Sequence, residues 1–369
     1  MTALWWLVLL GVVTAAVWAA YRRPPQVSLT RSVPPAGFTG GRVPLHVTLR
    51  LRSHLPMRVV WEDELPLSLI PEAPLAGKLL LLGDRSSELS TNLTLKKRGV
   101  YSWPGATVRW ADPLGLFWRS LKVSPDTRLE VYPGTHGLTL PDLLRPLLSE
   151  GTLTRSLGLE DAISLRGARE YVYGDPPGRV HWKLSARTDT LMVRELERMA
   201  ASSLTVFVDV FGNSDVYVES AVRLAASLIR EAGELELPVA VATTGQQSPT
   251  GRGEASLHAA LQVLARIQPN TLPPVIPPTR AGGNLIIITG RAGADLIRQA
   301  MYARAQASRV SIIALPEGFY LEPGENPRRQ WGGLPDAVRE LERMSGVLAG
   351  SGILVYVLRG NQSVLQIAP

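Results

Sequence analysis

The sequence predicts an α/β domain built on a mostly parallel sheet, preceded by an all-β domain and by one N-terminal transmembrane helix. Three observations predict this fold class. From Leu204 onward, short apolar runs alternate with amphipathic stretches, which is typical of buried parallel strands and their covering helices. Between residues 26 and 134, apolar and polar residues alternate with a period of two. Residues 1–21 contain no charged side chain.

The first segment, residues 1–22, predicts a transmembrane anchor. About 20 residues at ~1.5 Å per residue match a hydrocarbon core of roughly 30 Å. Trp5 and Trp18 lie toward its two ends, and Arg22 and Arg23 close it. Arginines on that side favour a single-pass protein of the cell membrane with the bulk of the chain in the cytoplasm. A cleaved signal peptide is the competing interpretation, but the segment lacks a basic start.

The second segment, residues 26–134, predicts an all-β, immunoglobulin-like sandwich. Alternation is clear at residues 43–51 and 89–95, and Pro and Gly residues separate several short strands. Residues 79–82 form a continuous apolar run, which predicts a fully buried strand. Leucines recur at helical spacing in residues 138–160, which predicts a helical connector.

The third segment, residues 161–369, contains a dense polar stretch followed by the α/β pattern. Residues 191–196 predict an additional edge strand of the sheet, and the proline-rich residues 268–283 predict a loop. Five core strands and four helices are predicted: strands at 204–210, 238–244, 284–289, 309–315 and 352–358, and helices at 216–231, 257–267, 292–307 and 335–348.

Charge and composition exclude several classes of function. The net charge is +7, and the excess of Lys and Arg falls within residues 22–133. Without a Lys/Arg-rich helix or an aromatic RNA-binding motif, the sequence predicts no nucleic-acid partner. The chain has no cysteine, which excludes disulfides, thiol catalysis and thiolate metal sites.

Charged and aromatic residues crowd residues 163–197 without apolar periodicity. This stretch reads Arg-Glu-Tyr at 169–171, then Gly-Asp at 174–175, then Arg-Val-His-Trp-Lys-Leu-Ser-Ala-Arg at 179–187. It resembles the signature of the "domain of unknown function 58" family, and residues 112–117 resemble part of the preceding β-region of that family. The resemblance implies a membrane-anchored member whose C-terminal part is a von Willebrand factor A-like, Rossmann-like domain.

The same resemblance implies a protein partner, because proteins of this family often accompany MoxR-type AAA+ ATPases. We therefore predict a membrane-anchored, non-enzymatic scaffold or adaptor. Its candidate residues form either an ion-pair network that fixes the segment or a partner surface, and both roles stay open. These candidates are Arg169, Tyr171, Asp175, Arg179, Trp182, Ser185 and Arg187.

A metal site is the second hypothesis. In von Willebrand A domains an Asp-x-Ser-x-Ser motif and a later acidic residue hold a divalent cation. Here Asp209 is present, but Phe211 and Asn213 replace the serines, and the later position reads Thr-Gly-Arg at 289–291. We predict no metal and no cofactor; if Mg²⁺ binds, Asp209, Asn213 and Thr289 are its candidate ligands. The corresponding function is an exterior-facing, cation-dependent binding receptor.

Enzyme signatures are absent from the sequence. It contains no Gly-x-Ser-x-Gly, Walker, dinucleotide-binding or His-Glu-x-x-His motif, so we predict no catalytic residues. A serine-type hydrolase that uses Ser185, His181 and Asp175 is the remaining alternative. It requires an exposed Ser185 within hydrogen-bond reach of a base.

Overall fold

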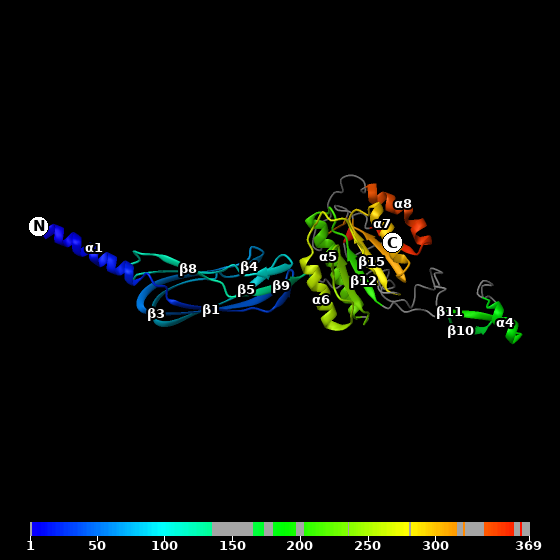
Figure 1. Ribbon diagram of the computed structural model, residues 1–369, viewed down its shortest axis with the longest axis horizontal. Helices are drawn as coiled ribbons and strands as arrows, with labels where there is room; N and C mark the ends of the chain where they lie inside the picture. Colours follow the sequence, from blue (N-terminus) through cyan, green and yellow to red (C-terminus); the bar gives the residue numbers. More distant parts are fainter. Residues whose placement is uncertain are drawn as a thin grey trace. The chain divides into compact units, whose positions relative to one another are not determined.

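The chain divides into two compact units, Met1–Gly134 and Thr135–Pro369 (Figure 1). The helical connector predicted at residues 138–160 lies outside the described residues. The computed structural model describes residues 2–134, 165–172, 180–196, 203–234, 236–279, 282–315, 320–321, 336–357 and 362–363.

The first unit begins with helix α1 (Thr2–Ala20), whose side chains are described from Leu4 onward. Most of its large apolar side chains are exposed. The end of the helix is held by cation–π contacts, because the guanidinium carbons of Arg22 and Arg119 lie 5.9 and 5.1 Å from the ring centroid of Trp18. The helix is therefore attached to the strands at its C-terminal end.

Among the described residues, no helix is both long and apolar enough to cross a membrane. This finding contradicts the predicted transmembrane anchor at residues 1–22 and the predicted single-pass protein of the cell membrane. The prediction relied on the absence of charge in residues 1–21. The helix that forms there, α1, has 19 residues, Thr2–Ala20, and the absence of charge does not by itself make such a helix a membrane span.

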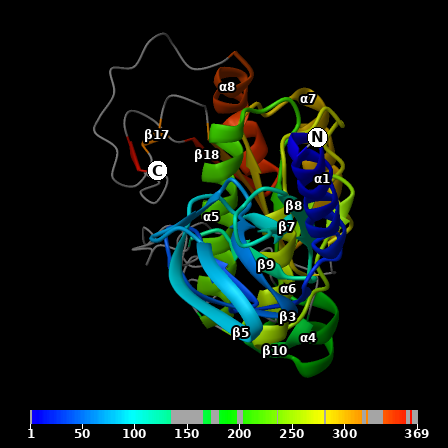
Figure 2. The same cartoon turned by 90° about the vertical axis from the view of Figure 1, so that its left-hand side faces the viewer.

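The larger sheet of the first unit is antiparallel and is organised by two long strands. Strand β5 (Ala76–Leu95) pairs along nearly the whole of β3 (Arg42–Glu64), whereas β1 (Gln26–Ser32) and β7 (Gly105–Ala111) share the other edge of β3. Figure 2 shows β3 and β5 side by side as a bent ribbon. The strand order is β4 (Leu69–Pro71), β5 (Ala76–Leu95), β3 (Arg42–Glu64), β7 (Gly105–Ala111) and β8 (Arg119–Val123), with β1 (Gln26–Ser32) paired to β3.

The smaller sheet has the order β2 (Ala36–Phe38), β9 (Arg128–Tyr132) and β6 (Gly99–Ser102). Both sheets contribute to one hydrophobic core, which includes Leu45 of β3 and Val131 of β9. The predicted alternation at residues 43–51 is confirmed, because every second residue is buried. An immunoglobulin-like sandwich stays a prediction.

The predicted fully buried strand at residues 79–82 is wrong. Only Leu81 is fully buried, whereas Leu80 and Leu82 are 62% and 61% exposed. The reason is that β5 belongs to an antiparallel sheet with a single face on the core, so consecutive leucines point to opposite faces. A continuous apolar run does not distinguish this case from a strand covered on both faces.

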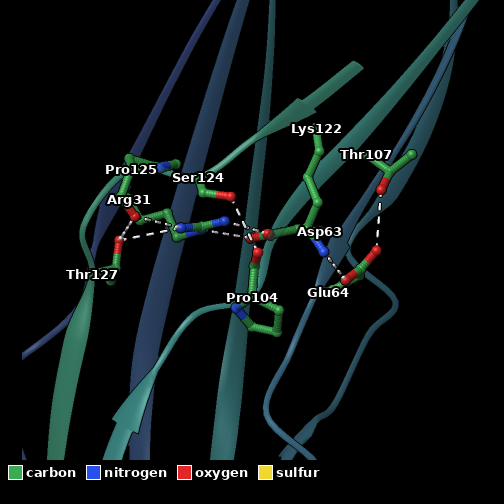
Figure 3. Close-up of polar contacts among 9 residues, drawn as sticks. All are labelled: Arg31, Asp63, Glu64, Pro104, Thr107, Lys122, Ser124, Pro125 and Thr127. Atoms are coloured by element: carbon green, nitrogen blue, oxygen red, sulfur yellow. Dashed lines mark hydrogen bonds and ion pairs between the residues drawn. The ribbon is translucent and has the colours of Figure 1, made fainter. Parts of the chain in front are cut away.

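A buried ion pair links strands β1 and β3 of the first unit (Figure 3). The Nη2 and Nε atoms of Arg31 donate to the two carboxylate oxygens of Asp63 at 2.6 and 2.9 Å, and both side chains are fully buried. The Nη1 atom of Arg31 also donates to the hydroxyl of Thr127 at 3.2 Å and to the carbonyl of Pro125 at 3.4 Å. The bidentate pair links β1 to β3. The other hydrogen bonds of Arg31 link β1 to the segment before β9.

The residues at 112–117 have a structural role. The carboxylate of Asp112 accepts hydrogen bonds from the backbone N–H groups of Leu114, Leu116 and Phe117 at 2.9, 2.8 and 2.8 Å. A single buried carboxylate thus organises the whole turn after β7.

The second unit contains a six-stranded sheet whose strands are parallel except for β14. Each of the five predicted core strands overlaps an observed one. A von Willebrand A-like fold stays a prediction. The order is β14 (Gln246–Gln247), β13 (Val239–Thr243), β12 (Leu204–Val208), β15 (Asn284–Thr289), β16 (Arg309–Ala314) and β18 (Ile353–Val357), and a separate short pair joins β17 (Tyr320–Leu321) to β19 (Gln362–Ser363).

Two helices cover each face of this sheet (Figure 1). Helices α5 (Asp215–Glu234) and α6 (Gly253–Arg266) lie on one face, and α7 (Ala294–Arg304) and α8 (Asp336–Gly350) lie on the other. All four overlap predicted helices. The apolar periodicity of these segments was sufficient to predict the helices, because each helix buries one apolar stripe against the sheet.

The predicted edge strand at residues 191–196 is assigned to the wrong sheet. Strand β11 (Met192–Leu196) pairs antiparallel with β10 (Leu165–Glu170) in a sheet of two strands, with helix α4 (Trp182–Thr188) between them in sequence. Strand β10 was not predicted. The backbone groups of a short strand need hydrogen-bond partners, and β10 supplies them to β11, so β11 does not have to join the parallel sheet.

Candidate functional site

The first candidate site is the signature hairpin, which we define as residues 165–172 and 180–196. Its two strands pair from Leu165 with Leu196 to Glu170 with Met192, and the pairing extends through the backbone N–H of Tyr171, which donates to Leu191 at 2.7 Å. The hairpin places the described part of the segment that carries the family resemblance on a hydrogen-bonded frame.

Two side chains stabilise helix α4, and one of them attaches it to this frame. The Nδ1 atom of His181, the N-cap residue, accepts from the backbone N–H of Leu184 at 3.2 Å. The hydroxyl of Ser185 donates to the carbonyl of His181 at 3.1 Å and accepts from the backbone N–H of Met192 at 2.8 Å. Ser185 therefore links the helix to β11.

These contacts bear on the hydrolase alternative, which requires an exposed Ser185 within hydrogen-bond reach of a base. His181 and Ser185 lie one helical turn apart. The hydroxyl of Ser185 is half-buried and bonded to backbone groups rather than to the imidazole. Asp175, the third residue of the hydrolase hypothesis, lies outside the described residues.

The hairpin exposes apolar and basic side chains. Trp182, at the start of α4, is 67% exposed, and Val172 and Leu191 are also exposed. Lys183 and Arg187 are exposed on the same short helix. The described part of the hairpin thus exposes three large apolar side chains and, on α4, two basic ones.

The structure brings together only some of the predicted residues. Arg169 is exposed on β10, and Tyr171 is half-buried. Asp175 and Arg179 lie outside the described residues, so the predicted ion-pair network stays a prediction. The sequence pattern does not identify Val172 and Leu191 as surface residues, because they lie next to strand ends, where no periodicity marks an exposed side chain.

The second candidate site lies at the carboxyl ends of β12 and β15. The chain passes from β12 to β13 on one side and then to β15 on the other, so these ends form the topological switch point, where ligands of open α/β sheets bind. Asp209 directly follows β12, and Thr289 ends β15. The hydroxyl of Thr289 donates to Asp209 Oδ2 at 2.8 Å, and the backbone N–H of Phe211 donates to Asp209 Oδ1 at 3.1 Å.

The N-terminal end of α5 packs closely against this point. The amide nitrogen of Asn213 donates to the carbonyl of Phe211 at 3.1 Å, and the hydroxyl of Tyr217 donates to the carbonyl of Ile288 at 3.1 Å. A Cβ atom at Gly290 would collide with Asn213 Oδ1 and lie 2.9 Å from the Tyr217 ring. Only glycine permits this approach, and this requirement was not visible in the sequence.

Burial raises the pKa of the Asp209 carboxyl above its ordinary value. The hydrogen bonds from Thr289 and from the backbone of Phe211, together with the charge of Arg291, oppose this rise. The unfavourable burial of the Asp209 carboxyl group is therefore partly offset by these hydrogen bonds and by the charge of Arg291.

The residues present do not fit a divalent cation. Among the described residues, no three His, Asp or Glu side chains form a cluster that could hold a metal ion. Mg²⁺ requires several oxygen ligands in octahedral geometry, and Asn213 turns its amide nitrogen toward two backbone carbonyls, those of Phe211 and Asp209. Asp209, Asn213 and Thr289 do lie together, but as a hydrogen-bonded group.

The fold and these two sites define a protein with a β-rich first unit, an Arg- and Trp-containing hairpin and a parallel α/β sheet. Residues 167–314 match the family described as "Protein of unknown function DUF58". The chain is also similar to the uncharacterized protein YeaD of Bacillus subtilis (strain 168), with 25% identity over 294 residues, 75% of this chain and 73% of the relative. Both matches support the predicted family.

Solved structures show only partial similarity. The CARDB domain of a Pyrococcus furiosus protein has 10% identity and a TM-score of 0.20, over 30% of this chain and 90% of that chain. A protein of unknown function from Porphyromonas gingivalis W83 has 17% identity and a TM-score of 0.24, over 32% of this chain and 52% of that one. These TM-scores are too low to support an argument about function.

Proposed function

We propose that the chain is a non-enzymatic adaptor that binds a protein partner through the signature hairpin. The observation that carries the proposal is the 67% exposure of Trp182 on a short helix, α4, that also exposes Lys183 and Arg187. Tryptophan and arginine are enriched among residues that dominate binding energy at protein interfaces. A large aromatic side chain held in water on a fixed helix is a suitable anchor for a partner.

The frame of the hairpin supports the same proposal. His181 caps α4, and Ser185 joins it to β11, so the direction of the helix is fixed before a partner binds. Preorganisation reduces the entropy lost on binding. The basic residues favour a partner with an acidic surface. The family resemblance implies a MoxR-type AAA+ ATPase as that partner.

The two alternatives lack comparable support. A hydrolase needs a free nucleophile, and the hydroxyl of Ser185 is bonded to backbone groups on both sides. A cation-dependent receptor needs a cation, and the group around Asp209 lacks the oxygen ligands to hold one.

The test is a Trp182→Ala variant of the full chain, compared with wild type by crosslinking in cells, purification and quantitative mass spectrometry. We expect recovery of the specific partner to fall ~10-fold or more, because truncation of an anchor costs about 2 kcal/mol or more. The thermal midpoint should not change. The matched control is Tyr302→Ala, which removes an exposed aromatic ring from α7 and should leave recovery unchanged.

Recovery of the same partners at wild-type levels by Trp182→Ala would refute the hairpin as the binding surface. The identity of the partner is tested separately by assaying the recovered complex for ATP hydrolysis. A partner without ATPase activity would refute the AAA+ assignment and leave the adaptor proposal standing.

A further inference from the structure

At the switch point, every hydrogen-bonding position of the Thr289 hydroxyl is occupied by a neighbouring group of the protein. A threonine hydroxyl has one proton and two lone pairs. The hydroxyl of Thr289 accepts from the backbone N–H groups of Arg291 and Ala292 at 3.2 and 3.0 Å. Its proton is therefore directed to Asp209 Oδ2, 2.8 Å away. No lone pair of this hydroxyl is left for a cation.

The side chain of Arg291 supplies positive charge at the same place. A Cβ atom at Gly212, in the loop after Asp209, would lie 3.4 Å from Arg291 Nη1. Arg291 is exposed, and among the described residues its guanidinium makes no hydrogen bond or ion pair. Gly212 has a φ of +60°, so the loop depends on a glycine where the guanidinium lies.

We propose that Arg291 is a built-in counter-charge for Asp209, and that Arg291 and Thr289 together replace a divalent cation at the switch point between β12 and β15. A buried carboxylate needs compensating charge or hydrogen bonds. In this chain hydrogen bonds come from Thr289 at the end of β15 and from the backbone of Phe211, and positive charge comes from Arg291 in the loop that joins β15 to α7. The stability of the second unit is then independent of divalent cations, whatever the partner of the hairpin.

The first test measures thermal unfolding of the full chain in EDTA and in millimolar Mg²⁺, Mn²⁺ or Ca²⁺. We expect the same midpoint in all four conditions. A rise of the wild-type midpoint by more than about 2 °C with any of these ions would overturn the proposal, because a ligand that binds the folded state raises the midpoint.

The second test is a double-mutant cycle of Asp209→Asn and Arg291→Ala. Arg291→Ala should lower the midpoint by roughly 2–4 °C in the wild-type chain and have little effect beside Asp209→Asn. The control is Arg298→Ala, which removes an exposed arginine of α7 that pairs with Asp295, and its effect should be equal in both backgrounds. Equal effects of Arg291→Ala in both backgrounds would refute a charge interaction.

A charge-conserving variant keeps the proposal testable if Asp209→Asn does not fold. Arg291→Lys should retain most of the wild-type midpoint, and Arg291→Gln should lose as much as Arg291→Ala. If Lys and Gln at this position give the same midpoint, the charge of Arg291 has no such role.

Discussion

At the scale of single residues, hydrogen-bond direction decides the character of the switch point. Asp209, Asn213 and Thr289 are residue types that can ligate a cation, and the chain brings them together. The backbone N–H groups of Arg291 and Ala292 fill the lone pairs of the Thr289 hydroxyl, so it acts as a donor to the carboxylate. Residue type alone therefore permits a metal site that the local geometry does not provide.

The close approach of α5 to β15 predicts the effect of Gly290→Ala. The new Cβ atom would meet Asn213 Oδ1 and the Tyr217 ring. We expect a loss of about 1–3 kcal/mol in unfolding free energy, measured by urea titration. The control Gly346→Ala adds a methyl group in an open position of α8 and should be neutral or stabilising. Equal effects would show that the close contact is not rigid.

The buried carboxyl of Asp209 predicts a pH dependence. Its pKa is raised in the folded state, so below the ordinary Asp pKa of about 4 both states are protonated and the carboxyl does not oppose folding. As the pH rises through the folded-state pKa, the unfolded chain has already lost this proton and stability falls. Asp209→Asn removes this slope, so the variant should gain stability relative to wild type as the pH increases. A difference that is constant with pH, measured by urea titration, would contradict this expectation.

At the scale of elements, the signature hairpin shows which interactions override sequence pattern. Residues 191–196 have the composition of a strand, but they pair with β10, whose charged sequence shows no strand pattern. Helix α4 has only seven residues, too few for periodicity, and depends on its cap and on Ser185. Local capping and tertiary hydrogen bonds, rather than apolar spacing, form this element.

Ser185→Ala should loosen α4 from β11. It removes the hydroxyl that accepts from the backbone N–H of Met192, at a cost of about 1–3 kcal/mol for an unsatisfied group. We expect faster hydrogen exchange at the Met192 amide. Thr188→Ala, which removes an exposed hydroxyl at the end of α4, should leave that amide unchanged. Unchanged exchange in both variants would show that Ser185 does not hold the hairpin together.

The buried pair of the first unit predicts a large effect from Asp63→Ala. The variant leaves Arg31 charged and without its carboxylate partner, which costs about 3–5 kcal/mol for a buried pair. Asp126→Ala, which breaks the exposed pair with Arg128, should cost less than about 1 kcal/mol. Chemical unfolding of the three proteins measures the difference, and similar losses in both variants would contradict the structural role of Arg31 and Asp63.

At the scale of the whole molecule, the described residues of the two units contribute to separate hydrophobic cores, two of which show this clearly. One draws on residues up to Val131, and the other draws on residues from Phe207 onward. We therefore predict that Asp63→Ala and Gly290→Ala shift different unfolding transitions in calorimetry. A common shift of one cooperative transition in both variants would contradict this expectation.

The sequence by itself determined the regular elements. The period-two pattern of residues 43–51 and the apolar runs from Leu204 onward located strands correctly, and amphipathic stretches located α5 to α8. These patterns are reliable because burial on a sheet or a helix stripe imposes its own spacing on the residues. The chemistry of the dense polar segment followed only in part, since its charged residues have no spacing rule.

Only the tertiary structure decided where these elements meet. It separated β11 from the parallel sheet, exposed Leu80 and Leu82, and directed the Thr289 proton to Asp209. Each outcome depends on groups that are distant in the sequence. A pattern along the chain records which side of an element is apolar, whereas pairing partners and hydrogen-bond directions are set by neighbours in space.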